Sequence, residues 1–301
     1  MLGAAACLAL LVLVWFAAFH IGFFRNLDYS TYQQFVNLRE AHGRVAWIAQ
    51  HVTGLFDPNP YVYLVLVPVV VALLRRRPRV VLAAAAIVLG ANATTELLKH
   101  VLTAPRPASL DGGGVVWLPG GYWPSGHSTA VMALVLVSVL AAPARLRPVV
   151  AALGAALAIV VGYSLLALAS HYPSDVLGGF LVAASWTLCA VAALLAAERW
   201  RPTGRGSHER VSIRAVLGAP AAVVVAALVL GLVLVVVRPH DVDAYVQAHR
   251  AFVLGAAGIA ALSLIVSTGV VLSVRRDPSA TPGSGPAPTA APRRRWRPGS
   301  G

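Results

Sequence analysis

The sequence is organised around the stretch from Lys99 to Asp175, which reads KHVLTAPRP at 99–107, PSGH at 124–127 and SLLALASHYPSD at 164–175. The residues around these three polar clusters are almost entirely apolar, and an ionisable group in apolar surroundings usually serves a function. Lys99 is the only lysine in the chain, whereas the other 23 basic residues are arginines. A compact ammonium at this one position indicates a specific role for it.

The composition is that of an integral membrane protein. Of the 301 residues, 58% are hydrophobic and 12% are charged, whereas soluble domains carry about 25% charged residues. The net charge of +13 would indicate a nucleic-acid partner in a soluble protein. Here the arginines form short clusters between apolar runs, where they set membrane topology, so we expect no nucleic-acid partner. Cys7 and Cys189 lie inside apolar runs and are expected to pack as small hydrophobes.

Eight apolar runs are predicted to be membrane spans, for which about 20 helical residues cross the bilayer core. They cover residues 2–24, 58–74, 80–98, 127–142, 149–169, 176–197, 215–237 and 252–274. A cleaved signal peptide is the alternative for the first run, but no Lys or Arg precedes it and it exceeds the usual core of about 7–15 residues. Residues 25–59 are polar with apolar positions at helical spacing, and are expected to lie on the membrane surface.

The distribution of basic residues predicts the orientation. With a cytoplasmic N-terminus, 17 of the 24 basic residues face the cytoplasm, as the positive-inside rule requires. The opposite side then receives 8 of the 11 acidic residues and 8 of the 9 histidines. All three polar clusters fall together on this extracytoplasmic side.

The residues of the three clusters suit phosphate chemistry. Cationic and hydroxyl donors together bind a tetrahedral oxyanion, and Ser125-Gly126 stands at the N-terminus of a predicted helix, which favours an anion. His127 and His171 beside such a site indicate a nucleophile and a general acid. Asp175 follows His171 by four residues, so its carboxylate can accept from one ring nitrogen and leave the other free to attack.

Taken together, the clusters resemble the membrane-bound type 2 phosphatidic acid phosphatases, which share a superfamily with the vanadium haloperoxidases. The family pattern is Lys-x6-Arg-Pro, then Pro-Ser-Gly-His, then Ser-Arg-x5-His-x3-Asp. The first two motifs are complete here, at Lys99 with Arg106-Pro107 and at 124–127. The third has Ser164, His171 and Asp175 in register, but Leu165 stands at the arginine position. The resemblance covers residues 28–197.

This resemblance implies a role for each matching residue. His171 would attack phosphorus to form a phosphohistidine, Asp175 would orient His171, and His127 would protonate the leaving oxygen. The residues that would hold the phosphate are Lys99, Arg106, Ser125 and Gly126. No metal and no other cofactor is implied, and the sequence shows no set of metal ligands. The expected substrate is a lipid phosphate or diphosphate in the bilayer, such as an isoprenoid diphosphate, phosphatidylglycerol phosphate or phosphatidate.

We therefore expect an all-α, polytopic membrane helix bundle, with a six-span phosphatase core and two C-terminal spans. The expected regions are an N-terminal span at 1–27, the core at 28–198, a basic link with two extra spans at 199–276, and a disordered cytoplasmic tail at 277–301. The expected location is the inner or plasma membrane, with the active site on the extracytoplasmic side.

Leu165 leaves alternatives open. Loss of one preorganised donor costs about 3–4 kcal/mol of transition-state stabilisation, so either the site is slow or another cation replaces the arginine. His100, Arg238 and Arg250 lie on the same predicted face. The first alternative function is a catalytically weak binding or scaffold protein on the same fold. A transporter is disfavoured because the ionisable residues cluster at one face, and a vanadate-dependent peroxidase because those relatives are normally soluble.

The orientation can be measured by thiol labelling. A cysteine introduced at Gly113 should react with an impermeant thiol reagent in intact cells, whereas one at Arg205 should react only after the membrane is opened, because the basic residues place position 205 in the cytoplasm. Labelling of position 205 but not of position 113 in intact cells would reverse the predicted orientation.

Overall fold

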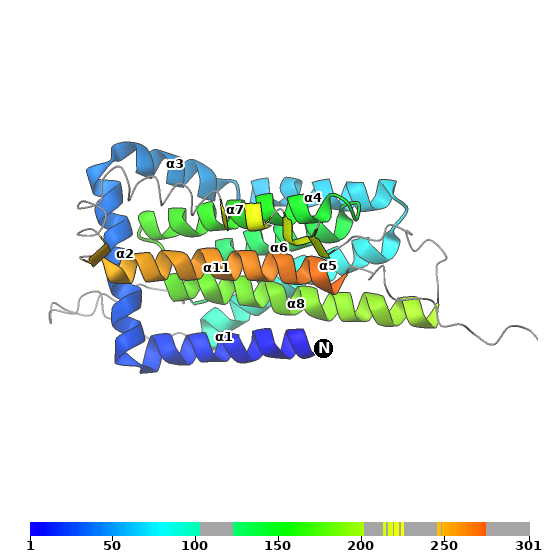
Figure 1. Ribbon diagram of the computed structural model, residues 1–301, viewed down its shortest axis with the longest axis horizontal. Helices are drawn as coiled ribbons and strands as arrows, with labels where there is room; N and C mark the ends of the chain where they lie inside the picture. The colour runs from blue at the N-terminus through cyan, green and yellow to red at the C-terminus, as the bar shows by residue number, and fades with distance from the viewer. Residues whose placement is uncertain are drawn as a thin grey trace, which may run out of the picture.

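The structure is a computed structural model and describes residues 1–102, 123–201, 213–214, 216–218, 220–222, 224–225, 246–247 and 249–274. Within these ranges the chain is helical and has no strand. The helices, drawn in Figure 1, are α1 (Leu2–His20), α2 (Gly22–Ala41), α3 (Gly43–Gly54), α4 (Pro58–Leu74), α5 (Pro78–Val101), α6 (Gly126–Ala141), α7 (Arg147–Ala167), α8 (Pro173–Trp200) and α11 (Arg250–Ser273). The predicted span at 215–237 lies mostly outside the described residues, and the predicted tail at 277–301 lies wholly outside them.

Five of these helices, α1, α5, α7, α8 and α11, are long and apolar enough to cross a membrane. Helices α3 and α4 pass the same test together, as a pair bent by 61°, and α6 is a shorter apolar helix of 16 residues. The prediction of an all-α membrane helix bundle is therefore confirmed. The first helix ends at His20, earlier than predicted, because Ile21 has an extended backbone and the chain turns there into α2.

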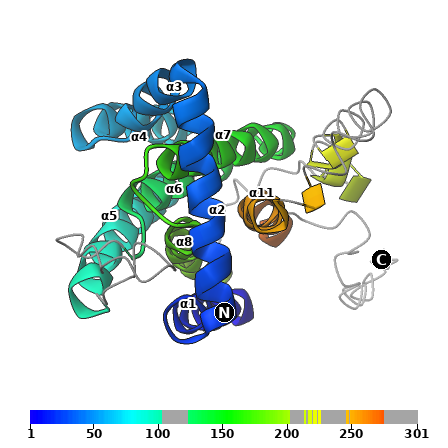
Figure 2. The same ribbon diagram turned by 90° about the vertical axis from the view of Figure 1, so that its left-hand side faces the viewer.

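Helix α6 forms the centre of the bundle, between α5, α7 and α8 (Figure 2). Of its 16 residues, 13 are buried, as expected for a helix that is apolar on all sides. Its side chains belong to one apolar cluster that extends onto α7, α8 and α11. The N-terminus of this central helix carries the PSGH cluster, so the core fixes the position of that cluster.

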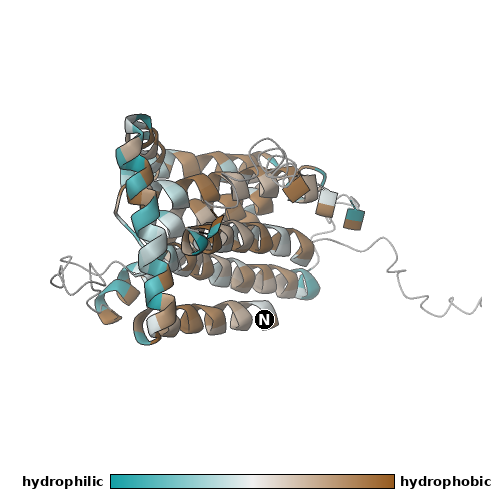
Figure 3. Ribbon diagram, turned by 60° about the vertical axis from the view of Figure 1, so that its left-hand side comes forward, coloured by the Kyte–Doolittle hydropathy of each residue, from teal (hydrophilic) through white to brown (hydrophobic). Residues whose placement is uncertain are grey.

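Helix α2 crosses one end of the bundle instead of running along it (Figures 1 and 2). Phe35 anchors α2 to the bundle through apolar contacts, and its ring is buried. The centroid of this ring lies 5.2 Å from the ring centroid of Tyr163 on α7 and 4.9 Å from that of Phe252 on α11. The helix is more hydrophilic than the bundle that it crosses (Figure 3). This is the orientation expected of a helix at a membrane surface when the bundle stands across the membrane.

At the opposite end of the bundle, arginines bind the C-terminal carbonyl groups of neighbouring helices. Arg77 donates to the Leu140 carbonyl oxygen of α6 at 3.0 Å. Arg79 donates to Glu198 Oε2 at 2.9 Å and to the Arg201 carbonyl oxygen at 2.8 Å, at the end of α8. The C-terminus of a helix carries partial negative charge, which these guanidinium groups complement. The arginines that predict the topology thus also tie the helices together.

Helix α8 approaches the first turn of α6 so closely that a side chain has no room between them. A Cβ on Gly179 would lie 2.7 Å from the Ser125 carbonyl oxygen and 2.8 Å from Ser128 Cβ. A Cβ on Gly178 would lie 3.0 Å from atoms of Trp123 and Pro124. Two consecutive glycines therefore allow α8 to pack directly against the segment that begins α6.

A methyl group at Gly179 tests this packing. Gly179→Ala should lower the midpoint of thermal unfolding in detergent, because overpacking costs about 1–3 kcal/mol and each kcal/mol corresponds to roughly 2–4 °C in a domain of this size. Gly258→Ala on α11 is the matched control, because the added methyl group would have no atom within 4 Å apart from its own residue, its chain neighbours and the nearby backbone of its own helix. The packing account is wrong if both variants unfold at the wild-type temperature.

Candidate active site

The three polar clusters meet at the end of the bundle that α2 crosses. Lys99 lies in the last turn of α5, Ser125 is the N-cap of α6, Gly126 and His127 begin α6, His171 lies in the link from α7 to α8, and Asp175 lies in the first turn of α8. Arg106, the remaining predicted phosphate ligand, lies outside the described residues.

Lys99 lies beside the first residue of α6. Its Nζ is 3.3 Å from the position that a Cβ of Gly126 would occupy, so glycine leaves room for the ammonium at this helix N-terminus. The same Nζ donates to Glu96 Oε1 at 2.7 Å, one turn earlier on α5. The first and second clusters are therefore adjacent, with a cation at the helix end whose free N–H groups favour an anion.

Ser125 connects the second cluster to the third. Its backbone N–H donates to the Asp175 carbonyl oxygen at 3.0 Å. Its side-chain oxygen accepts from the Ser128 backbone N–H at 3.3 Å, and its carbonyl oxygen accepts from Thr129 Oγ1 at 2.9 Å. Because Ser125 is fully buried, its hydroxyl serves as a helix N-cap in this structure, a role that we did not predict for it.

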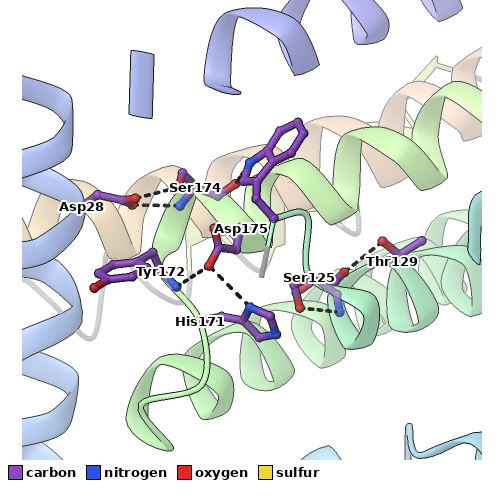
Figure 4. A network of polar contacts seen from close by, with 9 residues as sticks. Asp28, Ser125, Thr129, His171, Tyr172, Ser174 and Asp175 are labelled. Atoms are coloured by element: carbon purple, nitrogen blue, oxygen red, sulfur yellow. Dashed lines mark hydrogen bonds and ion pairs between the residues drawn. The ribbon is translucent and has the colours of Figure 1, made fainter. Parts of the chain in front are cut away.

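His171 and Asp175 contact each other as their spacing predicts. His171 Nδ1 lies 3.4 Å from Asp175 Oδ2, and the same oxygen accepts the Tyr172 backbone N–H at 2.9 Å (Figure 4). The Asp175 side chain is completely buried. A carboxylate at Nδ1 fixes the orientation of the imidazole ring.

His127 has a carboxylate partner that sequence reasoning missed. Its Nε2 lies 3.2 Å from Oδ1 of Asp57, which is the N-cap residue of α4. Both side chains are partly exposed, at 35% and 59%. Asp57 is 70 residues away in the sequence, and the only signal for it was the concentration of acidic residues on the predicted extracytoplasmic side.

Leu165 lies in the main apolar cluster with 2% of its surface exposed. Its side chain therefore contributes to packing, while its carbonyl oxygen accepts from the Ser170 N–H at 3.0 Å and closes the end of α7. Of the three alternative cations, His100 lies in the last turn of α5, Arg250 begins α11, and Arg238 lies outside the described residues.

The arrangement as a whole can bind an oxyanion and transfer a proton. An ammonium and a helix N-terminus supply positive potential, and an imidazole ring beside a carboxylate is a group that can act as a nucleophile or in acid–base catalysis. Among the described residues, no group of three or more His, Cys, Asp or Glu side chains gathers as a metal site. A metal-free reaction stays a prediction.

Comparison with known proteins agrees with this geometry. Residues 80–199 match the family model of the PAP2 superfamily, and no curated protein sequence gives a significant match. Among solved structures, a transmembrane PAP2 type phosphatidylglycerolphosphate phosphatase from Bacillus subtilis is similar in fold, with a TM-score of 0.54 and 18% sequence identity, over 67% of this chain and 100% of that one. Residues 80–199, which contain all three polar clusters, are therefore similar to the PAP2 superfamily, and they lie within a membrane protein that is helical throughout its described residues.

Proposed function

We propose that this protein is a lipid phosphate or diphosphate phosphatase that acts at the extracytoplasmic face of the membrane through a phosphohistidine intermediate. The observation that carries the proposal is the pair of His171 and Asp175, held against the N-terminus of α6 by the hydrogen bond from Ser125 N–H to Asp175 C=O. The PAP2-superfamily match and the likeness in fold to a bacterial membrane phosphatase support the reaction class.

The phosphate group binds first. Lys99 and the backbone at Gly126 supply positive charge and N–H donors at the start of α6, and Arg106 adds a guanidinium group from the first cluster. Ser125 supports this site by capping the helix that presents the donors. Such donors stabilise an oxyanion most when they are held in place before the reaction.

Two chemical steps follow. In the first, Nε2 of His171 attacks phosphorus, an N–P bond forms, and the bond from phosphorus to the leaving oxygen breaks while that oxygen takes a proton from His127. In the second, His127 takes a proton from water, and the resulting hydroxyl attacks phosphorus and breaks the N–P bond. The alcohol, or a phosphomonoester from a diphosphate, leaves in the first step, and inorganic phosphate leaves in the second, after which both histidines are back in their starting state.

The position of the site fits a lipid substrate. The clusters lie at the end of an apolar bundle, beside a helix that crosses this end as a surface helix does (Figure 3). An acyl or isoprenoid chain can stay in the bilayer while its phosphate head group reaches the site. The excess of arginine at the other end supports an extracytoplasmic site.

A catalytically weak binding or scaffold protein on the same fold is the second candidate. It is favoured by Leu165, which lies in the apolar core and offers no donor to a phosphate. Release of phosphate by the purified wild-type protein decides between the two functions.

The histidine roles give a specific prediction. His171→Ala should abolish phosphate release from both phosphatidate and nitrophenyl phosphate, because the nucleophile is lost. His127→Ala should lose about 10²–10⁴-fold in rate on phosphatidate, and much less on nitrophenyl phosphate, whose leaving group needs no proton. Because His127 also activates water in the second step, the measurement is the rate of the first step, read as the leaving group (diacylglycerol or nitrophenol) released in the first turnover of the purified protein in detergent.

His51→Ala is the matched control, since this histidine lies on the surface of α3 with Nδ1 near the Trp47 carbonyl oxygen, and it should retain wild-type activity. A chelator should leave the wild-type rate unchanged. Equal losses for His127→Ala on both substrates would refute its role as a general acid. A wild-type protein that releases no phosphate from any lipid phosphate would favour the scaffold function.

A further inference from the structure

Asp28 is a buried carboxylate for which the mechanism above has no role. It lies on α2, outside the segment that matches the PAP2 superfamily, and only 8% of its surface is exposed. Burial of a carboxylate is costly unless hydrogen bonds compensate it. Its position therefore depends on the partners that it binds.

Both oxygens of Asp28 accept hydrogen bonds from one residue, Ser174 (Figure 4). Oδ1 accepts the Ser174 backbone N–H at 2.8 Å, and Oδ2 accepts the Ser174 hydroxyl at 2.6 Å. Ser174 is the second residue of α8, so the backbone N–H has no partner within its own helix. A negative charge at this position also complements the helix dipole.

The residue that Asp28 holds is next to the catalytic pair. Ser174 immediately precedes Asp175, which contacts His171, and the Ser174 carbonyl oxygen accepts from Trp123 Nε1 at 3.2 Å. Two residues before Ser174, the ring centroid of Tyr172 lies 4.8 Å from that of Tyr32, which is also on α2. Helix α2 thus holds the turn from His171 to Asp175 at two points.

We propose that Asp28 is a positioning residue for the reaction, which holds the first turn of α8 so that Asp175 orients His171 for attack on phosphorus. This inference rests on the proposed phosphatase function. Asp28 acts through Ser174 and does not touch the substrate. It therefore should affect the rate of the chemical step and not the binding of the lipid phosphate.

The test compares steady-state kinetics of Asp28→Ala, Asp28→Asn and Ser174→Ala on phosphatidate in mixed micelles. Asp28→Ala should lower kcat about 10–100-fold, because small displacements of reacting groups cost up to about 10²-fold, and should leave KM within about twofold. Asp28→Asn should lose less, because its amide oxygen can still accept the Ser174 N–H. The double variant Asp28→Ala with Ser174→Ala should lose no more than Asp28→Ala alone, since coupled residues are not additive.

Thr31→Ala is the matched control. Thr31 is buried one turn further along α2, and its hydroxyl donates to the Ala251 carbonyl oxygen of α11 at 2.8 Å. This variant removes a hydrogen bond that holds the same helix to α11, away from the turn from His171 to Asp175. It should therefore keep the wild-type kcat. Thermal unfolding of each variant shows which ones are folded, and Ser174→Ala carries the test if Asp28→Ala does not fold.

The outcomes separate the two proposals. If wild-type protein releases no phosphate, the proposed function fails and this inference fails with it. If the wild type is active and Ser174→Ala and every folded Asp28 variant keep the wild-type kcat, the inference alone fails. Equal losses of kcat in Thr31→Ala and Asp28→Ala would also overturn it, because they would assign α2 a general structural role.

Discussion

The hydrogen bond from Ser125 N–H to Asp175 C=O, at 3.0 Å, joins the first turns of α6 and α8, and the rest of the site depends on it. Gly179 permits this contact because any side chain at that position would meet the backbone of α6. The two helices consequently begin at the same place, and each helix N-terminus contributes positive potential there. Lys99 adds a full charge beside Gly126, which makes this end of an apolar bundle suitable for an anion.

The two histidines differ in their surroundings in a way that fits the two chemical roles that we propose for them. His171 and its completely buried partner Asp175 form the more enclosed pair, in which 12% of the histidine side chain is exposed. Such enclosure suits a nucleophile that must keep one orientation. His127 and Asp57 are more open to solvent, at 35% and 59%. An acid–base group that serves a departing lipid oxygen and then a water molecule needs such access. Asp28 extends the supporting contacts of the enclosed pair to the surface helix α2.

The spans and the contact within the third cluster could be predicted because both depend on local sequence. An apolar run of sufficient length predicts a membrane-spanning helix directly. The four-residue spacing of His171 and Asp175 likewise brings their side chains together in one turn. Asp57 and Asp28 could not be predicted as partners, since 70 and 146 residues separate them from the groups they contact and their places depend on how α2 and α4 pack. The cap formed by Ser125 was predictable in principle, because serine is a preferred residue before a helix. The burial of Leu165 depends on how its side chain packs in the main apolar cluster, and its position in the third motif does not predict that packing.

The central claim is that His171 carries the phosphoryl group during turnover, and trapping of that intermediate tests it most directly. Purified protein is mixed with phosphatidate labelled in its phosphate, quenched within the first turnover in alkaline denaturant, digested, and mapped by mass spectrometry. The account predicts an acid-labile, alkali-stable phosphate on the peptide that contains His171. The label should be absent from His171→Ala. It should accumulate in His127→Ala when labelled nitrophenyl phosphate is the donor, because no base then activates the water that attacks phosphorus in the second step. A phosphate bound to another residue, or rapid turnover with no label on His171, would contradict the account.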